Sequence, residues 1–197
     1  MTRANWVIRI AGAIVILVNA AVSAQAQTAA FSVIDDAVGS RFFEPATTRV
    51  DPIDRNRLII GFNTGLDTAL LKYREFRAST AAFSYTSAMD TISVKIAAPA
   101  GYYIAKVTYT QRGTGVVLRT GKAAGGTTWT VGDVSRPLGT FGTNPALTGT
   151  VNLTGQNRTV VPVSVTTSLF AFATPSLGSA SVQVTGADLR VQLLPLP

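Results

Sequence analysis

Apolar and polar residues alternate one by one along most of the chain beyond residue 90, which is the pattern of half-buried β-strands. The first clear example is residues 91–96, where Ile92, Val94 and Ile96 would share one face. In the next segment we expect two faces, occupied respectively by Tyr103, Ala105, Val107 and Tyr109, and by Tyr102, Ile104, Lys106 and Thr108. Residues 98–101 (Ala-Pro-Ala-Gly) separate the two segments as a turn, so the pair is predicted to form a hairpin or a corner between sheets.

The alternation continues toward the C-terminus in further segments separated by turn residues. Strands are predicted over 116–120 and 127–131, with the Gly-rich residues 121–126 as a long hairpin loop between them. More strands are predicted over residues 151–154, 161–166, 169–173, 179–185 and 189–194. Pro162 has no backbone N–H, so its strand is expected at a sheet edge or directly after a bulge. Residues 137–149, rich in Gly, Thr and Pro, are predicted to form the longest loop.

A helix is predicted at most once, near residues 67–76. Asp67 could cap it at the N-terminus, and the residues on one side at helical spacing are Leu66, Leu70, Tyr73 and Arg77. The same stretch also fits a strand with Leu71, Tyr73 and Glu75 on one face. Many short strands rich in Val, Thr and aromatic residues indicate a sandwich or a small barrel. We therefore predict an all-β fold, specifically an antiparallel β-sandwich of jelly-roll or immunoglobulin-like type.

The N-terminus has the features of a cleaved signal peptide. Arg3 and Arg9 supply positive charge, an apolar run follows over 10–18, and residues 24–26 form an Ala-Gln-Ala cleavage site. The apolar run is too short for a spanning helix, which needs about 20 apolar residues. We predict a signal peptide over residues 1–26, a single β-sandwich domain over residues 27–197, and no membrane span after cleavage. The protein is then expected in the periplasm, at the surface or outside a bacterial cell.

Most familiar routes of catalysis are excluded because the chain contains no His and no Cys. It cannot form a Ser-His-Asp triad, a cysteine nucleophile or a His-ligated metal centre. The acidic residues leave a pair of catalytic carboxylates possible, although several of them stand at turns or strand starts. Asp51, Asp54 and Asn56 offer the oxygen ligands that Ca²⁺ prefers, yet the arginines interleaved with them favour a salt-bridged loop. We predict no catalytic residue, no metal and no cofactor.

The basic excess lies in the second half of the chain. Residues 35–77 hold seven basic and seven acidic side chains, whereas residues 78–197 hold eight basic and three acidic ones. No acidic residue lies between Asp90 and Asp133. That stretch would attract a polyanion if its basic residues converge on one face, and would mean little if they are scattered.

The aromatic residues add a second element to a possible binding surface. Adjacent strand residues point to opposite faces, so Tyr102 and Tyr103 cannot both lie in the core. Trp129 alternates with threonines and shares a face with Val131, so it is expected in the core. An outward tyrosine among basic residues would suit an anionic polysaccharide, and the ligand-binding residues that we predict are Tyr102, Lys95, Lys106, Arg119 and Lys122.

The leading functional hypothesis is an exported, non-catalytic β-sandwich that binds a cell-surface or extracellular component, with a polysaccharide or other surface polyanion as the expected partner. In general character the chain resembles exported bacterial β-sandwich modules such as carbohydrate-binding and adhesion domains. The first alternative is a structural subunit of a surface fibre or matrix, assembled through the edges of the Pro162 strand and the C-terminal strand. The second is a carboxylate-dependent glycosidase or lyase. Export argues against nucleic acid as a partner, despite the aromatic and basic residues of 102–106.

Overall fold

The computed structural model describes residues 27–34, 48–62, 66–67, 72–73, 77–81, 84–118, 121–141, 146–173 and 178–197. These residues form β-strands and no helix. In chain order the strands are β1 (Ala30–Ile34), β2 (Arg49–Val50), β3 (Arg57–Ile60), β4 (Leu66–Asp67), β5 (Lys72–Tyr73), β6 (Arg77–Ala81), β7 (Tyr85–Ala97), β8 (Tyr102–Leu118), β9 (Gly121–Val131), β10 (Val134–Phe141), β11 (Ala146–Asn152), β12 (Val160–Ala173) and β13 (Ser179–Pro195). β8 and β13 each have 17 residues, so the strands are longer than the alternation predicted.

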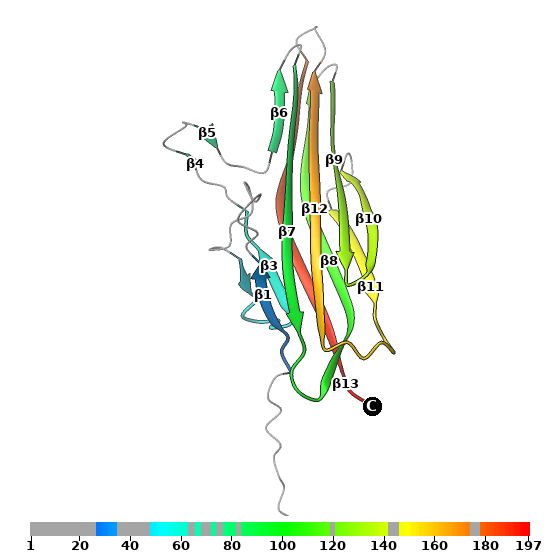
Figure 1. Ribbon diagram of the computed structural model, residues 1–197. Helices are drawn as coiled ribbons and strands as arrows, with labels where there is room; N and C mark the ends of the chain where they lie inside the picture. The colour runs from blue at the N-terminus through cyan, green and yellow to red at the C-terminus, as the bar shows by residue number, and fades with distance from the viewer. Residues whose placement is uncertain are drawn as a thin grey trace, which may run out of the picture.

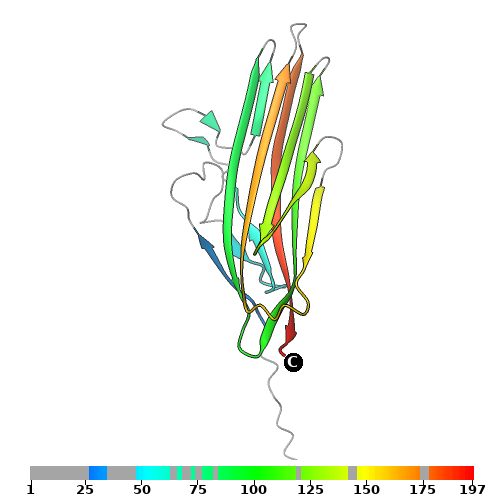
Figure 2. The same cartoon turned by 45° about the vertical axis from the view of Figure 1, so that its right-hand side comes forward.

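Two antiparallel sheets pack against each other as a β-sandwich, which confirms the predicted fold class (Figure 1). The five-stranded sheet has the order β1-β7-β12-β9-β10. The six-stranded sheet has the order β11-β8-β13-β3-β2, and β6 also pairs with β13. Consecutive long strands mostly lie in different sheets, so the chain crosses from one sheet to the other at each end (Figure 2). The predicted turn at residues 98–101 is therefore a corner between sheets, because β7 and β8 are not paired.

The inward-facing residues of the alternation form the core between the sheets. The larger hydrophobic cluster contains Ile92, Val94 and Ile96 together with Trp129, which is only 2% exposed. The core position predicted for Trp129 is thus confirmed. A smaller cluster, which includes Leu169, lies toward the end of the sandwich where β6 pairs with the start of β13, which we call the β6 end. Most of its members are Ala and Val, so smaller side chains fill the core there.

The predicted assignment of faces in β8 is wrong at Ile104. The register between β8 and β13 shifts between Gln192 and Leu193, which leaves Ala105 as an additional residue on β8. Tyr103, Ile104 and Ala105 are consecutive and all buried, and Ile104 belongs to the larger core cluster. A β-bulge interrupts the alternation of faces at this point. The pattern of residue types does not mark its position.

Two segments predicted as loops are strands instead. The Gly-rich residues 121–126 form the first half of β9 and pair with residues 168–173 of β12. Residues 137–149 consist largely of the end of β10 and the start of β11. Gly is disfavoured in strands, but a Cβ on Gly121 would lie 2.8 Å from the carbonyl oxygen of Phe172. The close approach of the two backbones therefore suits glycine at this position.

The strand that contains Pro162 lies in the middle of the five-stranded sheet and its pairing has no register shift, so the predicted sheet edge or preceding bulge is wrong. β12 pairs with β7 on one side and with β9 on the other, and its pairing with β9 begins only at Val163. The carbonyl of Pro162 accepts a hydrogen bond from the N–H of Gly132, in the turn beyond β9. The N–H and C=O of a strand residue point to the same side, so the missing N–H of Pro162 faces this turn and costs no ladder bond. β13 likewise lies between other strands in the sheet order, so neither strand is the edge strand that was expected for fibre assembly.

The remaining expectations concern the first half of the chain. Within residues 67–76 the described residues belong to β4 and β5, which pair with each other as strands. The predicted signal peptide over residues 1–26 lies outside the described residues, so it stays a prediction. Among the described residues, no helix is long and apolar enough to cross a membrane.

Candidate functional site

The outer face of the five-stranded sheet carries a group of exposed apolar side chains near the β6 end. We call Tyr85 and Met89 of β7 and Phe170 and Phe172 of β12 the aromatic platform. Their exposed fractions are 61%, 65%, 36% and 39% respectively. The rings of Tyr85 and Phe170 are 5.0 Å apart between centroids and tilted by 58°. Exposed apolar residues that gather in this way are typical of binding surfaces, whereas single ones are common everywhere on proteins.

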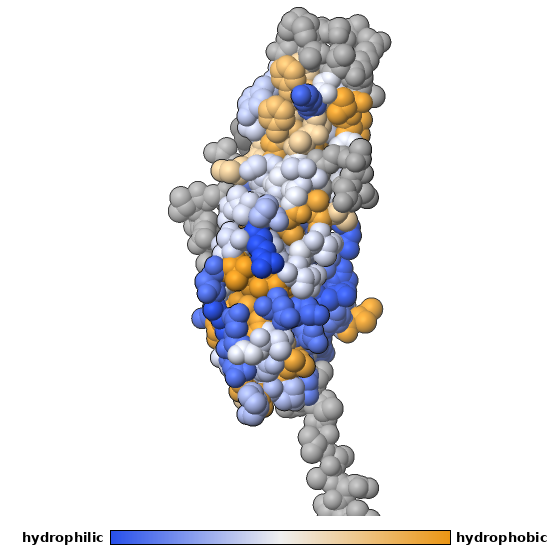
Figure 3. All heavy atoms as spheres, turned by 90° about the vertical axis from the view of Figure 1, so that its right-hand side faces the viewer, coloured by the Kyte–Doolittle hydropathy of each residue, from blue (hydrophilic) through white to orange (hydrophobic). Residues whose placement is uncertain are grey.

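The alternation in β7 and β12 explains why these residues point outward. In β12, Leu169 and Ala171 face the core, so Phe170 and Phe172 must face the other way. Phe172 lies opposite Tyr85 on one side and opposite Lys122 of β9 on the other. Figure 3 faces the side of the sandwich where β9, β10 and β11 lie, and among its coloured residues apolar ones gather in the upper part and mostly hydrophilic ones in the lower half.

Hydroxyl groups cover the middle of the same face. Thr128, Thr166 and Thr91 lie side by side on β9, β12 and β7, and the hydroxyls of Thr91 and Thr166 are 2.9 Å apart. The Oγ1 of Thr130 donates to the Oγ of Ser135 on β10. The outward-facing positions of β7, β9 and β12 include no carboxylate, because the one acid within these strands, Asp90, is buried. This face is therefore neutral to positive, with aromatic and hydroxyl groups as its main chemistry.

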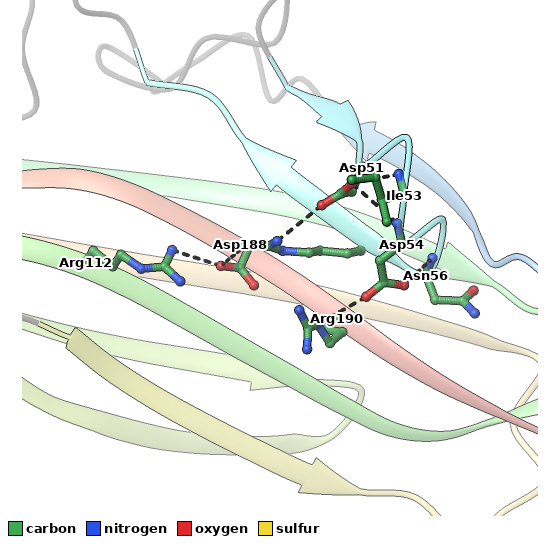
Figure 4. A network of polar contacts seen from close by, with 8 residues as sticks. Asp51, Ile53, Asp54, Asn56, Arg112, Asp188 and Arg190 are labelled. Carbon is green, nitrogen blue, oxygen red and sulfur yellow. Dashed lines mark hydrogen bonds and ion pairs between the residues drawn. The ribbon is translucent and has the colours of Figure 1, made fainter.

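The outer face of the six-stranded sheet has a different character, since ion pairs connect its strands (Figure 4). Asp188 of β13 is buried, and its Oδ2 lies 3.0 Å from Nη2 of Arg57 on β3 and 3.0 Å from Nη1 of Arg112 on β8. The other terminal nitrogen of Arg57, Nη1, lies 3.2 Å from Oδ2 of Asp51. The hydrogen bond to Asp188 raises the pKa of Arg57, against partial burial and with further help from Asp51. This guanidinium therefore stays charged and is held from two sides.

A pocket of about 470 Å³ opens beside this network. Among the described residues, its walls include three arginines, Arg49, Arg57 and Arg112, and one carboxylate, Asp188. The pairing of β13 explains the opening. β6 pairs with β13 as far as Gln183, and β3 pairs with β13 only from Ala187 onward, so neither strand pairs with residues 184–186. The residues between these two neighbours also contain the register shift of β13 against β8. We call this hollow the arginine pocket.

The turn between β2 and β3 is the salt-bridged loop that the sequence predicted. Besides its ion pair with Arg57, Asp51 accepts a hydrogen bond of 2.9 Å from the N–H of Ile53. This bond lowers the pKa of Asp51, partial burial opposes it, and Arg57 assists. Asp54 pairs with Arg190 at 3.3 Å. The described residues contain no group of three or more acidic side chains placed to hold a metal ion.

The basic residues predicted to bind ligand lie on both outer faces of the sandwich. Lys95 and Lys122 are exposed on the five-stranded sheet, opposite Pro162 and Phe172, which lie near the two ends of β12. Lys106 is exposed on the outer face of the six-stranded sheet. These three lysines therefore do not form one cluster.

The other two predicted residues contribute less. Tyr102 is partly buried at the start of β8, and its hydroxyl accepts a hydrogen bond from the side chain of Gln27. Arg119 lies outside the described residues. Of the predicted set, Lys122 is the residue that lies beside the aromatic platform.

Sequence reasoning did not single out the platform or the arginine pocket. Phe170 and Phe172 carried a usable signal, because they alternate with Leu169 and Ala171 in the printed sequence. The pocket carried none, since Arg57, Arg112 and Asp188 come from three distant segments.

No protein-family model matches this chain, and no curated protein matches its sequence.

Proposed function

We propose that this protein is an exported, non-catalytic glycan-binding protein and that the glycan lies on the aromatic platform. The observation that carries the proposal is the exposed group of Tyr85, Phe170 and Phe172 on the outer face of the five-stranded sheet. Aromatic rings offer wide apolar faces with little conformational freedom to lose on binding. The CH-bearing face of a pyranose ring is a complementary surface for them.

The surroundings of the platform favour a sugar over a purely apolar partner. Threonine and serine hydroxyls continue along the same face and can exchange hydrogen bonds with sugar hydroxyls. On β9, the small residues Ala124 and Gly126 stand opposite Phe170 and Ser168. A glycan chain that lies across the strands would therefore meet no bulky side chain at these two positions. A partner that is both polar and ring-shaped fits this combination.

The charges on this face support a neutral or acidic glycan. Lys122 lies beside Phe172, and Lys95 lies at the far end of the face. With no carboxylate at the outward positions of β7, β9 and β12, nothing on these strands repels an anionic chain. The contribution of the lysines should weaken as salt rises, whereas stacking on the rings should not.

Affinity electrophoresis in gels that contain soluble polysaccharides, with pull-down on insoluble ones, tests this proposal. Neutral and acidic polysaccharides are compared at low and high salt. We expect Phe172→Ala and Tyr85→Ala to reduce retention at least fivefold, and Lys122→Gln to reduce it only on acidic polysaccharides at low salt. Val160→Ala is the matched control, because Val160 is exposed on the same strand and face but at the other end.

Two results would refute the proposal. One is that no polysaccharide retains the wild-type protein. The other is that Val160→Ala weakens retention as much as Phe172→Ala does. Sedimentation at increasing concentration separates glycan binding from self-association: a dimer that Phe172→Ala abolishes would assign the platform to a second copy of the chain instead.

A further inference from the structure

A second surface of this protein, on the face opposite the platform, has the chemistry of an anion site. We propose that the arginine pocket binds an oxyanion, that is, a carboxylate, sulfate or phosphate group. The proposal concerns a different face from the glycan proposal and does not rest on it.

The charges in the pocket wall are unbalanced. Of the lining residues that the structure describes, three are arginines and one is a carboxylate. Asp51 forms an ion pair with Arg57 from outside the pocket wall. With Asp51 included, the charges of these described side chains still sum to a net positive value. A pocket that is hollowed into the protein raises the local potential, because its low-dielectric walls screen charges poorly.

Arg49 and Arg112 retain N–H donors that no described residue uses. Arg49 makes no hydrogen bond or ion pair with the residues that the structure describes. Its position on β2 opposite the outward Ile59 places it on the outer face of the sheet. Arg112 pairs with Asp188 through Nη1, and its side chain is 51% exposed. A guanidinium has five N–H donors, so this single contact leaves Arg112 able to bind a further oxygen.

The pocket is organised before any ligand arrives. Arg57 is held between Asp51 and Asp188, and Arg112 shares the same oxygen of Asp188. Fixing a side chain in advance removes part of the entropy cost of binding. Arginine forks match the geometry of carboxylate, sulfate and phosphate groups better than lysine does.

The shape of the pocket limits the ligand to a small group or to the end of a chain. Its volume of about 470 Å³ can hold a sugar acid or an inorganic anion. Phe62 and Ile59 add an apolar wall next to the arginines, which an inorganic anion would not use. Comparing the binding of sodium glucuronate with that of inorganic phosphate therefore distinguishes an acidic sugar from a free inorganic anion as the ligand.

Isothermal titration of the purified protein with each anion, at constant ionic strength set with sodium chloride, tests the proposal. We expect saturable binding that Arg49→Gln weakens about tenfold, which is the effect of removing one charge-assisted hydrogen bond. The Arg49 side chain has no hydrogen-bond or ion-pair partner among the residues that the structure describes, so this variant should keep its fold and its urea midpoint. Lys106→Gln is the control, because it removes the same charge from the same face outside the pocket.

The outcomes are distinct. Stronger binding of glucuronate than of phosphate assigns the pocket to an acidic sugar, and the reverse assigns it to a free inorganic anion. Absence of saturable binding for both anions overturns the proposal, as does equal weakening by Arg49→Gln and Lys106→Gln. Phe172→Ala should leave anion binding unchanged, so failure of the platform proposal and failure of this one can be told apart.

Discussion

On the inward face of β12, the buried Thr167 lies between Val165 of the larger hydrophobic cluster and Leu169 of the smaller one, and the hydrogen bonds around it allow a quantitative prediction. Gln111 of β8 is completely buried, and its Oε1 lies within hydrogen-bond distance of three hydroxyls. The distances are 3.0 Å to Tyr109, 3.2 Å to Thr127 and 3.0 Å to Thr167. The two threonine hydroxyls are also 3.1 Å from each other, so one can donate to the other. The amide nitrogen of Gln111 has no partner among the described residues.

Replacing Gln111 by Leu should destabilise the protein by about 1–3 kcal/mol. Two hydroxyl donors lose their acceptor, which lowers the free energy of unfolding by about 1–3 kcal/mol each. Removal of the unpaired amide nitrogen raises it by about 1–3 kcal/mol. The sign should reverse when the hydroxyls are absent. In a Tyr109→Phe, Thr127→Val and Thr167→Val background, the same substitution removes an amide with no partner left, and should be neutral or stabilising.

Urea unfolding, followed by the fluorescence of the buried Trp129 and by circular dichroism, measures both effects as shifts of the midpoint at unchanged slope. The triple background is the control for packing, since its own core contacts are nearly isosteric with those of the wild type. An equal loss of stability in both backgrounds would show that packing, and not the hydroxyl hydrogen bonds, sets the cost. That result would refute the role assigned to the hydrogen bonds of Gln111.

Three further predictions concern other parts of the fold. Gly149→Ala should lower stability by about 1–3 kcal/mol in urea unfolding, because its Cβ would clash with the side chain of Leu138 and lie 3.0 Å from Nε1 of Trp129. Gly126→Ala should not, since nothing lies within 4 Å of a Cβ there. A backbone hydrogen bond lowers the pKa of Asp51 below 3.8, so the stability it contributes is present above that pH and lost below it. The advantage of wild type over Asp51→Asn should therefore shrink in urea titrations as the pH falls below 3.8. Burial, and to a smaller extent the charge of Asp188, raise the pKa of Tyr109 above 10.0, so stability should fall above pH 10.0 and fall less steeply in Tyr109→Phe.

Much of the sandwich followed from the sequence because strand alternation is a local property. Ile92, Val94, Ile96 and Trp129 face the core as their neighbours predicted, since each polar residue between them must face water. Local pattern failed where a distant strand decides the conformation. The Gly-rich residues 121–126 are strand because β12 pairs with them, and Ile104 is buried because β13 forces a bulge beside it. Pro162 is tolerated in a central strand because β9 ends before its missing N–H would be needed.

The candidate surfaces divide in the same way. The sequence by itself determined that faces alternate over residues 91–96 and 169–173, and therefore that Phe170 and Phe172 lie on the face opposite Leu169 and Ala171. Only the tertiary structure decided that Tyr85 stands beside them, that Lys106 lies on the opposite face from Lys95, and that three distant segments meet around Asp188. The physical reason is that alternation fixes a side chain's face within one strand, whereas the order of strands is fixed by which sheets can bury their inner faces together.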